Sequence, residues 1–224
     1  MDPSSYDNLE KLLIDYVNTP GNKLDMKNLR EALESGPATE TYQLLDEIRS
    51  EKLDQTAIYL AAYRNQPETL KCLLDSVMAE HRYQLLQVLN VDGATPLHNA
   101  TYYGYTDVVM CICNSLKPEQ RYQLLTVQAM LGSTPLHYAA WQGHTELITY
   151  ILDSVEPAQQ IQLLELTDCY NETVLGVALL ERDNKSTADR IKQYYQRDIT
   201  SADGKYSNQG NINMNRNRNF CKRT

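Results

Sequence analysis

One short motif returns at a fixed interval along this chain of 224 residues, and it constrains the fold more than any other feature. Thr95-Pro96-Leu97-His98 recurs 39 positions later as Thr134-Pro135-Leu136-His137, and the same step in each direction reaches the runs that begin at Thr56 and Thr173. Such a period predicts units that stack in one direction and bury their apolar sides against their neighbours. The expected product is an elongated surface, and elongated surfaces of this kind bind other macromolecules.

The recurring residues resemble a known family. The run from Thr134 to His144, TPLHYAAWQGH, with the apolar residues that follow it, is similar to an ankyrin repeat, and residues 95–113 are nearly as close. The resemblance implies an all-α solenoid of stacked helix-turn-helix units joined by β-turns, and the family's usual role is to bind proteins. An ankyrin repeat is usually about 33 residues long, so each unit here is about six residues longer.

The additional residues follow the expected second helix of each unit. Residues 79–86, 118–125 and 157–164 are similar to one another, and each ends in Gln-Leu-Leu. Proline opens two of these segments, and proline is favoured in the first helical turn, where its missing N–H costs nothing. We therefore expect an extra short helix in each repeat, held to the stack by its two leucines.

Two positions of the unit predict its local geometry. The threonine of the motif is expected to cap the first helix, and two residues before it stand Asp54, Gly93, Gly132 and Asn171. These residue types best tolerate a positive φ, so a tight turn is expected between units. The family resemblance further implies that His98 and His137 bond to backbone and hydroxyl groups of neighbouring turns.

The period divides the chain into segments. We expect an N-terminal helical capping repeat over residues 1–55, three ankyrin-like repeats over 56–172 (56–94, 95–133 and 134–172), and a C-terminal capping repeat over 173–199. Residues 200–224 are rich in asparagine with interleaved arginine. Such a composition cannot build a core, and a disordered basic tail is expected there.

Charge separates this tail from the rest of the chain. The tail has a net charge of +4, whereas the first 199 residues hold 16 basic and 28 acidic groups. One alternative function is therefore a regulatory or inhibitory subunit that the tail tethers to nucleic acid or another anionic partner. Five basic residues are few for binding nucleic acid, which disfavours nucleic acid as the partner.

The sequence lacks the residue sets that catalysis needs. It has no Ser/His/Asp or Cys/His set, no glycine-rich phosphate loop and no cluster with metal-ligand spacing, so we expect no enzyme, cofactor, metal or small-molecule substrate. Cys111 and Cys113 stand where the next copy has Tyr150 and Leu152, which favours buried thiols over zinc ligands or a disulfide. Without a membrane span or signal peptide, a cytoplasmic monomer is expected, with a nuclear location left open.

The positions that vary between copies are the candidate binding residues. In ankyrin proteins the turn tips and the ends of the first helices line the concave face. The helix-end positions here are Tyr63, Arg64, Tyr102, Tyr103, Trp141 and Gln142, and the tip positions are Val91, Asp92, Met130, Leu131 and Tyr170. Rings at the same repeat position are expected in register, on helices about 8–10 Å apart.

Two interpretations of these rings stay open. The rings either pack on the adjacent first helix, or they contact a partner, since Tyr and Trp are enriched at binding hot spots. On the second interpretation the chain is a non-catalytic scaffold or adaptor that binds a protein or peptide across the rings. Arg64 and Glu181 would set the polarity of the ligand, and nearby acidic groups would favour a basic one.

Overall fold

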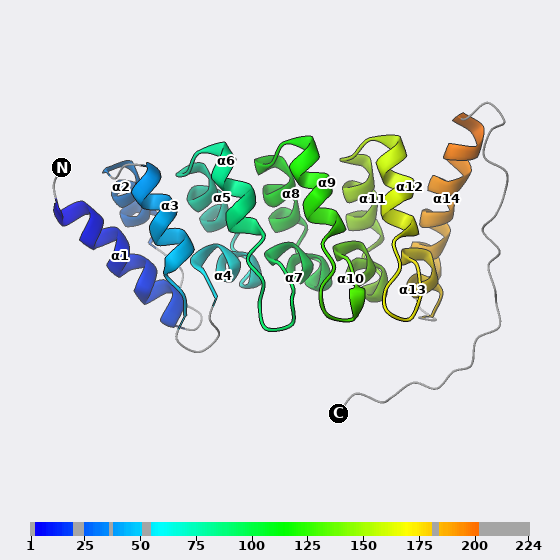
Figure 1. Ribbon diagram of the computed structural model, residues 1–224, viewed down its shortest axis with the longest axis horizontal. Helices are drawn as coiled ribbons and strands as arrows, with labels where there is room; N and C mark the ends of the chain where they lie inside the picture. The colour runs from blue at the N-terminus through cyan, green and yellow to red at the C-terminus, as the bar shows by residue number, and fades with distance from the viewer. Residues whose placement is uncertain (1–2, 20–24, 36–37, 51–54, 181–183, 202–224) are drawn as a thin grey trace.

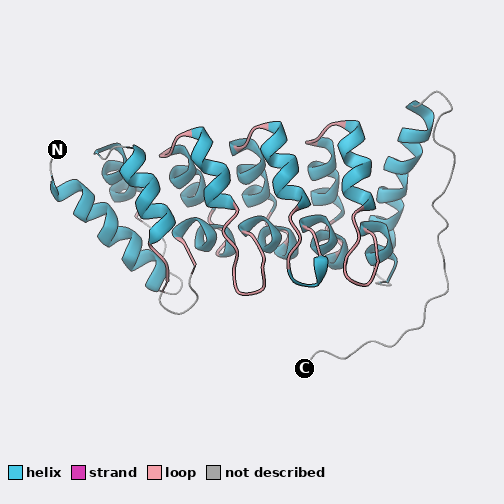
Figure 2. Ribbon diagram, viewed as in Figure 1, coloured by secondary structure: helices cyan, strands magenta, loops and turns pink. Residues whose placement is uncertain are grey.

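The computed structural model describes residues 3–19, 25–35, 38–50, 55–180 and 184–201. Within these ranges the regular structure is helical, apart from two isolated β-bridges that pair Arg49 with Thr56 and Thr167 with Thr173. The helices follow one another along a single axis, and the long loops between repeats lie along one edge (Figure 2). The predicted all-α solenoid is confirmed.

Each of the three central repeats contributes three helices. The first helices are α4 (Ala57–Tyr63), α7 (Pro96–Tyr103) and α10 (Pro135–Gln142); the second helices are α5 (Pro67–Asp75), α8 (Thr106–Ser115) and α11 (Thr145–Asp153); the third helices are α6 (Ala79–Leu86), α9 (Pro118–Thr126) and α12 (Pro157–Glu165). First helices pack on first helices, and third helices on third helices, so parallel rows result (Figure 1). The expected extra helix in each repeat is confirmed.

Different helices close the two ends of the stack. At the start are α1 (Pro3–Asn18), α2 (Met26–Ser35) and α3 (Ala38–Glu47), of which α1 packs on α4 and α3 packs on α6. At the other end α13 (Val174–Leu180) continues the row of first helices. The long helix α14 (Lys185–Ser201) packs on α11, α12 and α13, and so covers the second and third rows together (Figure 1).

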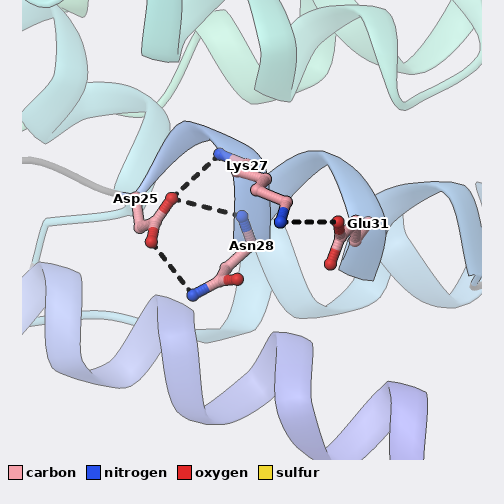
Figure 3. Close-up of polar contacts among 4 residues, drawn as sticks. All are labelled: Asp25, Lys27, Asn28 and Glu31. Atoms are coloured by element: carbon pink, nitrogen blue, oxygen red, sulfur yellow. Dashed lines mark hydrogen bonds and ion pairs between the residues drawn. The ribbon is translucent and has the colours of Figure 1, made fainter.

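A local hydrogen-bond network fixes the start of α2 (Figure 3). The Asp25 carboxylate accepts hydrogen bonds from the backbone N–H groups of Lys27 (3.0 Å) and Asn28 (3.3 Å), and the Asn28 amide donates to its other oxygen (3.1 Å). These bonds satisfy two N–H groups that have no partner inside the helix. The ion pair of Lys27 with Glu31 is exposed, with 3.9 Å between Nζ and Oε1, so it adds little stability.

The same repeat positions supply the core in each unit. The first helices contribute alanines that let neighbouring helices approach closely, and the second helices contribute leucine, isoleucine and valine. The two leucines of each third helix are almost fully buried: Leu85, Leu86, Leu124, Leu125, Leu163 and Leu164. The third helices are therefore part of the core.

In α7 and α10 the motif histidine joins the first helix to the turn at the end of its own repeat. His98 Nδ1 accepts a hydrogen bond from the Thr95 backbone N–H (3.1 Å), and His98 Nε2 lies 3.0 Å from the Val127 carbonyl oxygen, to which it donates. One neutral tautomer satisfies both contacts. His137 makes the equivalent bonds to Thr134 and Glu172. The predicted structural role of both histidines is confirmed.

The turns between repeats have the expected backbone geometry. Gly93, Gly132 and Asn171 have φ angles of 68°, 71° and 61°, whereas Asp54 lies outside the described residues. Leu131 also has a positive φ, of 65°, which the sequence did not predict. Because a β-carbon is strained in this region, Leu131 is an unusual residue for this position.

Arg121 links two repeats through the ends of their second helices. Its Nε donates to the Cys113 carbonyl (2.9 Å), and its Nη1 donates to the Ser154 carbonyl (2.7 Å) in the next repeat. Gln160 is the equivalent residue one repeat later, and its amide makes only the first kind of bond, to the Leu152 carbonyl (3.0 Å). Carbonyls at helix ends lack partners within the helix, so both side chains act as caps.

We expect Arg121→Gln to lower the free energy of unfolding by about 1.5–3 kcal/mol, the contribution of one hydrogen bond from a charged donor. Glutamine at this position should keep the bond to Cys113, as Gln160 does with Leu152, and lose the bond to Ser154. Arg121→Ala should cost more, because both carbonyls lose their partner. Urea unfolding followed by circular dichroism measures the difference. No loss of stability in Arg121→Gln would show that the link between repeats contributes nothing.

Candidate partner-binding face

The rings predicted at the ends of the first helices contact one another across three helices. Tyr63 of α4 lies edge-to-face with Tyr103 of α7, with 6.0 Å between ring centroids. Tyr103 lies 5.0 Å from Tyr102, and Tyr102 lies 6.2 Å from Trp141 of α10, again edge-to-face. We call these four residues the aromatic row. Each such contact contributes about 0.5–1.5 kcal/mol beyond the buried area.

The aromatic row also remains open to solvent. Tyr63 and Trp141 are each 41% exposed and Tyr103 is 44% exposed, while Tyr102 is half-buried. The rings therefore pack on one another and still present a surface, so the two interpretations of the sequence are compatible. Contact with a partner stays a prediction.

Two further tyrosines extend the aromatic row, and the sequence analysis missed both. Tyr138 lies 5.9 Å from Tyr102, and Tyr105 stacks on Tyr103 at 5.3 Å. Tyr138 stands three residues before Trp141, so helical spacing could have placed it on the same side of α10. No such signal exists for Tyr105, because it follows the left-handed Gly104 (φ 69°) beyond the end of α7.

The hydroxyl groups of Tyr59 and Tyr103 stay protonated at neutral pH. Burial raises the pKa of Tyr103, and the neighbouring phenols of Tyr63, Tyr102 and Tyr105 raise it further. Burial also raises the pKa of Tyr59, which lies in α4 and accepts a hydrogen bond from Asn99. The Tyr103 ring therefore offers an uncharged face, on which both apolar groups and cations can stack.

Side chains from the following repeat hold the ends of the ring-bearing helices. His144 Nε2 donates to the Tyr102 carbonyl (3.1 Å), and Asn184 Nδ2 donates to the Trp141 carbonyl (2.8 Å). Gly143 has a φ of 75° and ends α10. These contacts fix the backbone beneath the rings, which reduces the entropy that binding must overcome.

The predicted tip residues form a second exposed element. Val91, Met130 and Tyr170 are 85%, 55% and 64% exposed, Asp92 is exposed and Leu131 is half-buried. Backbone hydrogen bonds connect successive turns, from the Met130 N–H to the Asp92 carbonyl (2.9 Å) and from the Cys169 N–H to the Leu131 carbonyl (2.8 Å). Apolar side chains this exposed are typical of surfaces that another molecule covers.

Three predicted residues remain: Arg64, Gln142 and Glu181. Arg64 binds the last turns of α1: its Nη1 donates to the Tyr16 carbonyl (2.8 Å), and its Cζ lies 4.8 Å from the Tyr16 ring centroid. Its guanidinium is therefore already engaged within the protein. Gln142 is exposed at the end of α10, and Glu181 lies outside the described residues, as does the tail beyond Ser201.

The described cysteines differ in burial: Cys113 is buried, Cys72 and Cys111 are half-buried, and Cys169 is exposed. Cys72, Cys111, Cys113 and Cys169 are free thiols, and burial raises the pKa of Cys111 to about 11 and that of Cys113 to about 12. Among the residues that the structure describes, no group of three or more His, Cys, Asp or Glu side chains is placed to hold a metal ion. None of the described helices combines the length and apolar character needed to cross a bilayer.

Comparisons with known proteins give two matches. A family model described as ankyrin repeats (3 copies) matches residues 29–122, and a model described as ankyrin repeat matches residues 131–160. The two ranges include the four residues of the aromatic row. Among curated proteins, the search finds no match.

Proposed function

Because the chain belongs to the ankyrin repeat family, whose members are generally protein-interaction modules and typically non-catalytic, we propose that it is a non-catalytic scaffold or adaptor for a protein or peptide partner. The proposed contact surface consists of the aromatic row together with the exposed turn residues Val91, Met130 and Tyr170. We call this surface the aromatic face.

The observation that carries the proposal is the combination of contact and exposure in the aromatic row. Tyr63, Tyr103 and Trp141 are 41–44% exposed although each touches another ring. Tyrosine and tryptophan have few rotatable bonds and large apolar surfaces, so they gain much area on binding at a small entropic cost. Residues with these properties dominate binding hot spots.

The dimensions of the aromatic row suit a short segment of a partner. Neighbouring first helices are about 8–10 Å apart, so the three helices that carry the row span roughly 20 Å. An extended chain covers this distance with about six residues, at about 3.3 Å for each. A peptide or an exposed loop is therefore sufficient to engage all four rings.

We expect the double substitution Tyr63→Ala and Trp141→Ala to weaken partner binding by about 30-fold or more, as the loss of hot-spot rings does. These two rings each make one ring contact, at the ends of the row. The unfolding free energy should therefore fall by only about 1–3 kcal/mol. Tyr102 is unsuitable for this test because it is half-buried and touches three rings.

The measurement is affinity capture from native lysate with quantitative mass spectrometry, followed by titration of the purified partner. Met78→Ala is the matched control: Met78 is also 41% exposed but lies between α5 and α6, outside the first helices and the turns that form the aromatic face. The control should keep the partner that the double variant loses. Retention of the partner by both variants, or its loss from both, would contradict binding at the aromatic face.

A further inference from the structure

We infer that the partner segment is basic, and that its arginine or lysine side chains lie on the aromatic row between two acidic edges. This inference rests on the proposed function and specifies the chemistry of the ligand at the same face. Three observations support it: the position of the acidic residues, the distribution of basic residues, and the way this protein already binds its own guanidinium groups.

The first acidic edge follows the rings at a constant interval. Glu68, Asp107 and Glu146 are exposed, and each stands five residues after an aromatic residue at the shared repeat position: Tyr63, Tyr102 and Trp141. The three carboxylates lie in the first turns of α5, α8 and α11, directly after the turn that ends each ring-bearing helix. An acid at a helix start is favoured by the helix dipole in any case, so this edge alone would identify no ligand.

The second acidic edge lies at the turns between repeats, at the opposite ends of the first helices. Asp92 is exposed in the turn at residues 87–95, and Asp168 and Glu172 are half-buried in the turn at residues 165–173. The charge of Asp92 reaches the first helices, since it adds to the rise in the pKa of Tyr59 that burial causes. The two edges are about 12 Å apart along an eight-residue helix, and the rings lie at the end nearer the first edge.

Basic residues are missing from the first helices and from the three turns that follow α6, α9 and α12, whereas the turn before α4 holds the exposed Arg49. The helices α4, α7, α10 and α13 and the turns at residues 87–95, 126–134 and 165–173 contain no Lys or Arg in their sequence. Arg64 directly follows α4, but its guanidinium is already bound by α1. The aromatic face therefore presents acidic groups that basic side chains of a partner can neutralise.

Within the part of the chain that the structure describes, arginine stacks on tyrosine at two places. The Arg64 guanidinium lies 4.8 Å from the Tyr16 ring centroid, and that of Arg197 lies 5.0 Å from the centroid of Tyr194. Arginine pairs a flat face for stacking with donors at its edge for carboxylates. The aromatic row with its acidic edges offers both kinds of contact to an incoming guanidinium.

The spacing of the first helices indicates how basic residues should be arranged in the ligand. A polyproline II segment repeats every three residues and advances about 9 Å in that interval. This distance matches the separation of about 8–10 Å between neighbouring first helices. A segment with a basic residue at every third position therefore places one cation at each ring-bearing helix.

Trp141 is the single tryptophan of the chain, so its fluorescence reports directly on this face. The test titrates the full-length protein with a peptide of about 12 residues that has arginine at every third position and serine and proline between. A matched peptide carries glutamate in place of arginine. The arginine peptide should change the Trp141 fluorescence to saturation, and added salt should weaken its binding. No binding of the arginine peptide up to about 1 mM, or equal binding of the glutamate peptide, would overturn the inference.

Charge reversal separates the acidic edge from the overall charge of the protein. Asp107→Lys with Glu146→Lys should weaken arginine-peptide binding about 10-fold or more, through two lost ion pairs and repulsion. The matched control is Glu80→Lys with Glu119→Lys, which changes the charge equally at exposed first-turn acids of α6 and α9. The control should change binding less than about 3-fold. Equal effects would show unspecific attraction and would contradict the inference.

The same variants distinguish the inference from the proposed function. If a captured partner is lost from the Tyr63/Trp141 variant but kept by the Asp107/Glu146 variant, the aromatic face binds a partner and its basic chemistry is wrong. If the Tyr63/Trp141 variant keeps the partner, the proposed function itself fails. Loss of the partner from both variants, with retention by the Glu80/Glu119 control, supports the two together.

Discussion

Replacing Leu125 with alanine is expected to lower the free energy of unfolding by about 2–5 kcal/mol. Leu125 is fully buried in α9. This helix packs on α6 of the preceding repeat and on α10 and α12 of the following repeat. Alanine removes part of the apolar contact and leaves a cavity that the surrounding helices fill incompletely. A loss of this size would establish that the third helix is required for stability.

Gln123→Ala is the matched control in the same helix. Gln123 is exposed, and alanine has a higher helix propensity, so its substitution should change stability by less than about 0.5 kcal/mol. Urea unfolding of the two variants and the parent protein measures both values. A similar, small effect of Leu125→Ala would mean that α9 is dispensable to the core.

Acidification from pH 7 to pH 4 is expected to lower the stability by about 3 kcal/mol through His98 alone. Burial lowers the pKa of His98 from its ordinary value of 6.5 to about 4. Between these pH values the unfolded chain binds a proton that the folded protein does not, so stability is complete above about pH 6.5 and is lost as the pH falls. Burial lowers the pKa of His137 as well, which adds to the loss in the same direction.

The double variant His98→Gln and His137→Gln tests this explanation. It should be less stable at pH 7, because it loses the bonds to Val127 and Glu172, yet lose less additional stability between pH 7 and pH 4. Urea midpoints at several pH values give both slopes. The two substitutions leave every carboxylate in place, so the comparison isolates the contribution of the histidines. Identical slopes would assign the pH dependence to groups other than these histidines.

Much of the fold could be predicted from the repeat because identical local sequences have identical local structures. The Thr-Pro-Leu-His copies predicted the helix starts, and the Gln-Leu-Leu copies predicted the third helices. The bond from Arg121 to Ser154 could not be predicted, since the same repeat position holds Gln160 one unit later. The positive φ of Leu131 was equally hidden, because a leucine gives no indication of the left-handed region.

The sequence predicted which helices carry the rings, but it did not predict how exposed the rings are or which other rings contact them. The equal spacing of Tyr63, Tyr102 and Trp141 placed the rings on neighbouring helices. Their exposure could not be predicted, because it depends on side-chain rotamers and on rings outside the repeat pattern, such as Tyr105. The contact of Arg64 with Tyr16 was hidden for another reason: residues 29–48 align with the first repeat at an offset of 41 in place of 39, so the N-terminal segment departs from the period.

Each inner first helix lies between two of its own kind, α7 between α4 and α10, and α10 between α7 and α13. A gene duplication that inserts one complete unit of 39 residues would therefore create only junctions of a kind already present. An insertion of a partial unit between the motif and the end of its repeat would separate the motif histidine from the carbonyl that it binds. The length of this solenoid can therefore change during evolution by whole repeats, and each change adds or removes one ring-bearing helix.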